Sequence, residues 1–126
     1  MFYVATIPSL ASTSTSTTSP PASPRVTHIQ IPNGAGANQS SLGNLGFYPN
    51  TVTVVIGANN TIEWTNDDTA THAVVSESVP AGASLFGDQN LGPGTAFTVT
   101  LTGAGTYTYH CTIHPWMTGT IIVKSA

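Results

Sequence analysis

The chain has 126 residues, which suits one domain with its own hydrophobic core. Charged residues make up only 6% of it and the formal net charge is −3, so it has no basic patch for a phosphate backbone, and nucleic acid is excluded as an expected partner. The single cysteine excludes a disulfide within the chain. Thr, Ser, Val and Gly are frequent while helix formers are scarce, which favours an all-β domain.

Residues 1–24 are predicted to be a tail outside the domain. The stretch 12–24, STSTSTTSPPASP, has no charge and no apolar periodicity, so it cannot bury enough surface to offset the entropy of ordering. Residues 1–11 are mildly apolar, lack the basic flank of a signal peptide and are too short to span a bilayer. We expect a disordered or tethering segment, either the remnant of a signal or membrane anchor or a terminus without a role.

Two features bear on where the protein works. Ser/Thr/Pro-rich stalks of the kind found at 12–24 commonly hold domains away from a cell surface. Asn38 and Asn59 each begin an Asn-x-Ser/Thr pattern, the acceptor for N-glycosylation in secreted proteins. Together they predict an extracytoplasmic location, periplasmic or at the cell surface, with the tail as a tether to a membrane.

From residue 25 onward, short β-type runs alternate with turn signals. Val52, Val54 and Ile56, for example, alternate with Thr51, Thr53 and Val55, as on a half-buried strand. Strands are expected at 26–31, 50–57, 60–66, 72–78, 95–101, 106–111 and 118–124. Residues 79–94 are too rich in Gly and Pro for long regular structure. The spacing predicts a Greek-key antiparallel β-sandwich of seven to eight strands over residues 25–126.

Cys111, His114 and Met117 form a Cys-x2-His-x2-Met pattern in the expected loop between the last two strands. Thiolate, imidazole and thioether are the donors of a mononuclear blue-copper electron-transfer site, which needs one more histidine. Zinc also accepts Cys and His, but it would not choose a thioether and would need a fourth hard donor. The pattern therefore predicts a copper site.

Three histidines are candidates for the missing ligand. His110 adjoins Cys111 on an expected strand, so the pleat turns it to the opposite face. His28 lies early in the first expected strand, with nothing around it to suggest a site. His72 opens a strand directly after an Asn/Asp-rich turn, where it can meet the loop at 111–117. We therefore predict His72, Cys111, His114 and Met117 as the metal ligands.

The stretches NTIEWTNDDTATHAVV (60–75) and GTYTYHCTIHPWMTGTIIV (105–123) resemble the cupredoxins, or type 1 blue copper proteins. The short ligand loop, with Pro115 after the histidine, is most similar to that of amicyanin; plastocyanin and pseudoazurin have a longer final spacing. The resemblance implies one copper ion on His72, Cys111 and His114 with Met117 as axial ligand. It also implies a one-electron carrier, not an enzyme, that cycles between Cu(II) and Cu(I).

The resemblance also implies how the carrier meets its partners. The edge of His114 would reach the surface within an apolar patch that includes Pro115 and Trp116, where redox partner proteins would dock onto a monomer. Three other functions compete with electron transfer. An open axial position would indicate a copper enzyme that acts on a small molecule such as nitric oxide. Copper that is easily lost would indicate a storage or delivery protein. A sandwich that binds no metal would indicate an adhesion protein.

Two positions depart from the pattern of the resembled family. Ile113 stands where relatives have proline, so its N–H is predicted to donate a second hydrogen bond to the sulfur of Cys111 and to raise the reduction potential. Ala73 stands where relatives commonly have an asparagine that links the two ligand loops, which makes Met117 the least secure ligand. Asp67 and Asp68 are interpreted as a solvated turn rather than as acidic contacts for a donor protein.

Overall fold

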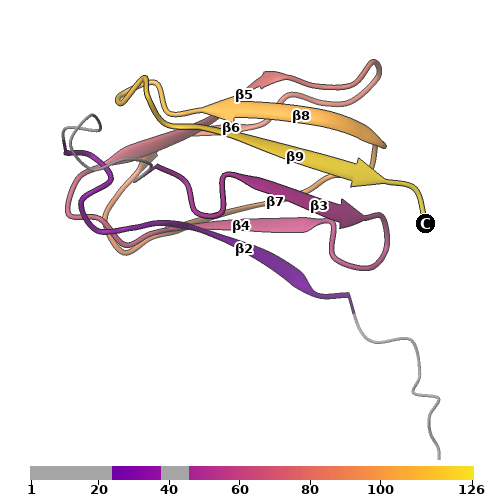
Figure 1. Cartoon of the computed structure of the whole chain (residues 1–126), viewed down its shortest axis with the longest axis horizontal. Helices are drawn as coiled ribbons and strands as arrows, with labels where there is room; N and C mark the ends of the chain where they lie inside the picture. The colour runs from indigo at the N-terminus through magenta and orange to yellow at the C-terminus, as the bar shows by residue number, and fades with distance from the viewer. Residues whose placement is uncertain (1–23, 38–45) are drawn as a thin grey trace, which may run out of the picture.

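The computed structural model describes residues 24–37 and 46–126, which form two packed β-sheets (Figure 1). Its eight strands are β2 (Val26–Ile31), β3 (Thr51–Val55), β4 (Thr61–Asn66), β5 (His72–Ser78), β6 (Gly87–Leu91), β7 (Ala96–Thr100), β8 (Gly105–His110) and β9 (Thr118–Lys124). The predicted all-β sandwich is confirmed. Within the described ranges, no helix has the length and apolar character needed to cross a membrane. The predicted tail lies almost wholly outside these residues, as do Asn38 and part of the connection before β3, so those predictions stay untested.

The sheets have the orders β2-β4-β7 and β3-β9-β8-β5-β6. Two of their pairings, β2 with β4 and β3 with β9, are parallel, so the prediction of antiparallel strands does not hold for these two pairs. Strands β2 and β4 are parallel because β3, which lies between them in sequence, belongs to the other sheet. The chain therefore reverses direction twice between β2 and β4. Whether the chain crosses to the other sheet depends on the connection between two strands. The alternation of apolar residues within a strand does not predict it.

The core lies between the sheets and follows the period-two alternation of the strands. Trp64 on β4 is its centre: it stacks on Phe97, lies 5.7 Å from the ring of Phe86, and meets Tyr109 of the other sheet edge-on at 5.2 Å. Trp64, Tyr107 and Tyr109 are all buried, which confirms them as core aromatics. Other buried strand residues are Ile29, Ile31, Val54, Ile62, Val74, Ile121 and Val123.

Strand β6 lies inside the stretch 79–94, where no long regular structure was expected. It is a short edge strand that pairs only with β5, and Leu91 is its one buried residue. A Cβ at Gly87 would lie 3.2 Å from the carbonyl oxygen of Val74, so glycine permits the close backbone approach. Strand β6 was not predicted because its sequence is mostly polar. A strand at an exposed edge of a sheet needs no alternation of apolar residues.

Strand direction brings the functional segments to one end of the sandwich, at the left in Figure 1. Because β2 and β4 are parallel and Ile31 pairs with Asn66, the segments that follow them lie together. Because β5 and β8 are antiparallel and Val75 pairs with His110, the start of β5 meets the end of β8. Residues 32–37, 67–72 and 111–117 therefore converge.

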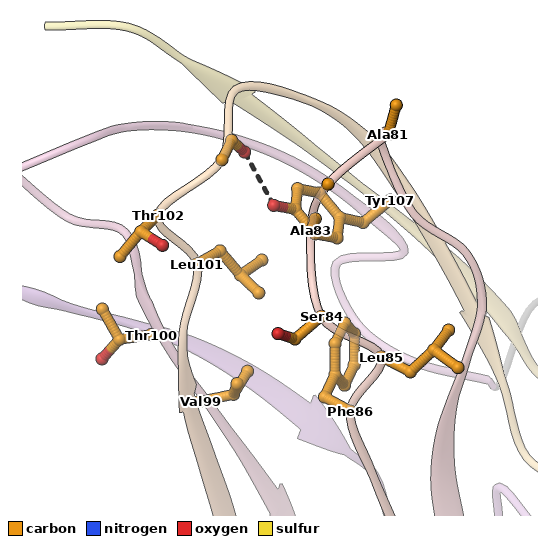
Figure 2. A pocket seen from close by; sticks show the side chains of 12 residues that line it. Ala81, Ala83, Ser84, Leu85, Phe86, Val99, Thr100, Leu101, Thr102 and Tyr107 are labelled. Carbon is orange, nitrogen blue, oxygen red and sulfur yellow. Dashed lines mark hydrogen bonds between the residues drawn. The ribbon is translucent and has the colours of Figure 1, made fainter.

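A pocket of about 390 Å³ lies at the other end of these strands, between residues 81–86 and 99–103 (Figure 2). Tyr107 is its one titratable lining residue, and its hydroxyl donates to the Gly103 carbonyl over 2.7 Å. The pocket contains none of the predicted ligands. It has no set of side chains that could bind a metal.

Candidate metal centre

Three predicted donor atoms face one another at the converging end. Nδ1 of His72 and Nδ1 of His114 are 3.0 Å apart, and they lie 3.8 Å and 3.7 Å from Sγ of Cys111. His72 and Cys111 are fully buried and His114 is half-buried. Residues distant in sequence thus form one compact group of two imidazole nitrogens and one sulfur.

The separations suit a single ion bound between the three atoms. Metal bonds to imidazole and thiolate are about 2.0–2.3 Å long, so two donors to one ion lie no more than about 4.5 Å apart. All three observed separations fall below that limit. Soft thiolate with borderline imidazole favours copper or zinc over hard ions such as magnesium or calcium. The residues therefore fit the copper ion that the sequence predicts.

Met117 closes the loop that carries Cys111 and His114. The Cys111 N–H donates to the Met117 carbonyl over 3.0 Å, and the Met117 N–H donates to the His114 carbonyl over 2.9 Å. The side chain of Met117 is 0% exposed. Gly46 lies against it, since a Cβ there would be 3.8 Å from Met117 Cγ. The thioether is thus held inside the protein at the end where the three donors meet.

The sulfur of Cys111 accepts a backbone hydrogen bond from Ala73, with N and Sγ 3.2 Å apart. Ala73 is the second residue of β5, at a register shift between His72 and Val74, so its N–H is directed away from the strand ladder. The second bond predicted from Ile113 is not formed, and Ile113 is 48% exposed.

Asp68 was interpreted as part of a solvated turn, and that interpretation was wrong. It is 5% exposed, and Oδ2 lies 2.7 Å from Nε2 of His72. Burial raises the pKa of Asp68, but hydrogen bonds from His72 and from the backbone amides of Gly34, Thr69 and Gly36 outweigh it and hold the pKa well below its usual range. Asp68 is therefore a buried carboxylate that supports the ring of His72. Asp67 beside it is exposed, as expected.

His114 is less open than the resemblance implies. A Cβ at Gly36 would lie 3.1 Å from Nε2 of His114, so the backbone of that segment covers the outer edge of the ring. Trp116 flanks His114 with ring centroids 5.2 Å apart, and its Nε1–H donates to the Ala35 carbonyl over 3.3 Å. Burial lowers the pKa of His114, His72 lowers it further and Asp68 opposes both, which favours the neutral imidazole that binds metals.

The other two histidines lie outside this group. Nδ1 of His28 is 3.0 Å from Glu63 on the outer face of β2 and β4. His110 is turned away from Cys111 toward Glu77, with Nδ1 and Oε1 3.8 Å apart. The pleat argument that separated His110 from Cys111 thus agrees with the structure.

Comparison with known proteins identifies the family. A model of the cupredoxin-like domain matches residues 5–123. Amicyanin from Paracoccus versutus is 34% identical over 71 residues, which are 56% of this chain and 54% of that protein, so the chain spans about half the length of this curated relative.

Two solved structures extend the comparison. A purple cupredoxin from Nitrosopumilus maritimus aligns with a TM-score of 0.62 and 27% identity, over 78% of this chain and 99% of that one. A copper-containing nitrite reductase from Thermus scotoductus aligns with a TM-score of 0.64 and 26% identity, over 89% of this chain but only 25% of the reductase. The family match over most of the chain, the two-sheet sandwich and the His-Cys-His group agree: the chain belongs to the cupredoxin-like family.

Proposed function

We propose that this protein is a type 1 copper electron carrier. Its one copper ion is bound by Nδ1 of His72, Sγ of Cys111 and Nδ1 of His114, with Met117 as the axial ligand. The observation that carries the proposal is the convergence of these three donor atoms within 3.8 Å of one another beside a buried methionine. Family membership supports the same metal, because the residues that converge are those of the cupredoxin ligand pattern.

Bound copper would supply one-electron chemistry by changing between Cu(II) and Cu(I). The protein's part is to keep its donors in one place through that change. His72 and Cys111 lie in the packed core, where close packing resists displacement, and the two backbone hydrogen bonds of Met117 fix the loop. The thiolate favours Cu(II), and the Ala73 N–H draws density from the sulfur and favours Cu(I).

The burial of Met117, the proposed axial ligand, favours an electron carrier over a copper enzyme. An enzyme acting on nitric oxide would need an open position at the metal, whereas Met117 is fully buried and its backbone is hydrogen-bonded to Cys111 and His114. The similarity to nitrite reductase covers only a quarter of that enzyme. Storage or delivery is less well supported, since easy release calls for donors nearer the surface than His72 and Cys111.

Partners, location and organisation form part of the same proposal. Redox proteins would dock beside His114, where Pro115 and Trp116 contribute apolar surface, and the carrier would act as a monomer. It would work outside the cytoplasm, in the periplasm or at the cell surface, with residues 25–126 as the cupredoxin domain and 1–24 as a tail or membrane tether. The Ser/Thr/Pro composition of 12–24 supports the tail.

The test loads the full chain with copper, cycles it with small one-electron reductants and oxidants, and then adds nitric oxide to each form. A carrier returns one electron per copper over repeated cycles, and its visible spectrum is unchanged by nitric oxide. A spectrum that shifts with nitric oxide, accompanied by consumption of the gas, would contradict the carrier and support the enzyme.

A further inference from the structure

Asp68 is a buried negative charge beside the metal centre that no cationic side chain neutralises. Among the described residues, the one side chain within ion-pair distance is the ring of His72, which would be neutral as a metal ligand, and neither Lys nor Arg lies within that distance. Its other hydrogen bonds come from neutral backbone amides: Gly34 to Oδ1 at 3.0 Å, Gly36 to Oδ2 at 2.9 Å and Thr69 to Oδ1 at 2.8 Å. Such donors stabilise a carboxylate without cancelling its charge, so its field reaches the donors next to it.

The carboxylate determines which nitrogen of His72 is free. Oδ2 can only accept, so Nε2 of His72, at 2.7 Å, carries the proton. The lone pair is then on Nδ1, the atom that faces Cys111 and His114. Asp68 therefore holds the buried imidazole in the one tautomer that can bind a metal at this place.

Oδ2 of Asp68 also binds the backbone segment that lies against His114. Oδ2 accepts from both Nε2 of His72 and the amide of Gly36, and the backbone of Gly36 lies against Nε2 of His114. Gly34 has a φ of 96°, a left-handed conformation that turns its amide toward Oδ1 and that favours glycine. The Asp68 carboxylate thus connects the buried ring of His72 to the backbone that lies against the ring of His114.

We propose that Asp68 is a positioning residue that sets the electron affinity of the metal centre: its charge favours the oxidised copper, and its hydrogen bonds fix the ring of His72 and the segment Gly34–Gly36 over His114. This inference rests on the proposed copper site. The sign follows from electrostatics, because Cu(II) carries one more positive charge than Cu(I) and gains more from a nearby anion. Loss of the charge should therefore raise the reduction potential.

The first experiment compares Asp68→Asn with Asp67→Asn in the copper-loaded full chain by voltammetry. Both variants lose one negative charge from adjacent positions, but Asp67 is exposed and its carboxylate accepts from the Gln30 amide at 2.9 Å. Asp68→Asn should shift the Cu(I)/Cu(II) equilibrium at least tenfold toward Cu(I), about 59 mV for one electron, whereas Asp67→Asn should shift it less than twofold. Equal shifts in the two variants, or none in either, would overturn the role of Asp68 in a protein that still binds copper normally.

The second experiment needs no metal. Nitrogen-15 NMR of the metal-free wild-type chain should show His72 protonated at Nε2, with that proton in slow exchange, and the Gly36 amide should be protected from hydrogen exchange. Asp68→Asn should speed exchange at Gly36 at least tenfold while the Ala73 amide is unaffected. A wild-type His72 protonated at Nδ1 alone would overturn the inference whether or not the protein binds copper, whereas failure to bind copper at all would refute the proposed function first.

Discussion

The backbone N–H of Ala73 donates to Sγ of Cys111 over 3.2 Å, and it is the one amide donor that the described residues give this sulfur. Because that N–H lies at a register shift of β5, proline at this position would remove the sulfur bond without removing a ladder bond. We predict that Ala73→Pro lowers the reduction potential by tens of millivolts, since the bond is worth about 1 kcal/mol. Voltammetry measures the shift, and circular dichroism checks that the sheet is intact.

Replacement of Ile113 by proline is the matched control. The amide of Ile113 does not reach the sulfur in the structure, although the sequence predicted that it would. We now expect Ile113→Pro to leave the potential unchanged within about 10 mV, far less than the tens of millivolts expected for a lost bond. A fall in potential equal to that of Ala73→Pro would restore the earlier hypothesis of two sulfur bonds.

Met117→Leu tests the axial ligand. Leucine nearly conserves the buried volume, so the free energy of unfolding of the metal-free protein should fall by less than about 1.5 kcal/mol. Loss of the thioether removes a donor that favours Cu(II), so the potential should rise and the ratio of the visible bands should change. A variant with unaltered potential and spectrum would show that Met117 is not a ligand.

The choice of His72 over the other histidines is tested by three alanine variants. His72→Ala removes a buried donor from the group and should abolish the intense visible band on addition of Cu(II). His28→Ala and His110→Ala should retain the band, since these rings lie toward Glu63 and Glu77 and away from Cys111. Absorption spectra of the three variants at equal copper suffice, and loss of the band in His110→Ala would contradict the assignment.

Gly119 tests the packing that supports the ligand loop. It pairs with Tyr109 across β8 and β9, and a Cβ there would overlap the tyrosine ring. We predict that Gly119→Ala lowers the free energy of unfolding of the metal-free protein by about 1–3 kcal/mol or more, because the buried ring has no room to move. Gly92→Ala, where a Cβ would meet nothing within 4 Å, should change it by less than about 0.5 kcal/mol. Urea unfolding compares the two, and equal losses would contradict the packing argument.

Much of the fold was predictable because burial on a strand repeats every second residue. The runs around Val54, Trp64, Tyr109 and Ile121 showed that alternation, and each is a strand in the structure. Strand β6 lacked it because an exposed edge strand buries little. The parallel pairing of β2 with β4 depends on how the chain crosses between sheets, which no local pattern encodes.

The convergence of His72 on Cys111 and His114 was also predictable, since Cys111 and His114 are close in sequence and the strand-end position of His72 distinguished it from His28 and His110. Asp68 was missed because two of its hydrogen-bond partners lie in a distant segment of the chain. Its burial depends on Gly34 and Gly36, more than 30 residues earlier, which only the parallel pair β2 and β4 brings beside it. The signal that could have found it was its place four residues before a candidate ligand.

His72, Cys111 and His114 are proposed to bind one copper ion, with Cys111 as a thiolate. The most direct test adds Cu(II) to the purified full chain and records visible absorption and electron paramagnetic resonance, with Cys111→Ser as the control. We predict an intense thiolate-to-copper band and narrow copper hyperfine splitting at one copper per chain, both absent from Cys111→Ser. A wild-type protein that stays colourless with Cu(II), or a Cys111→Ser variant that keeps the band, would contradict it.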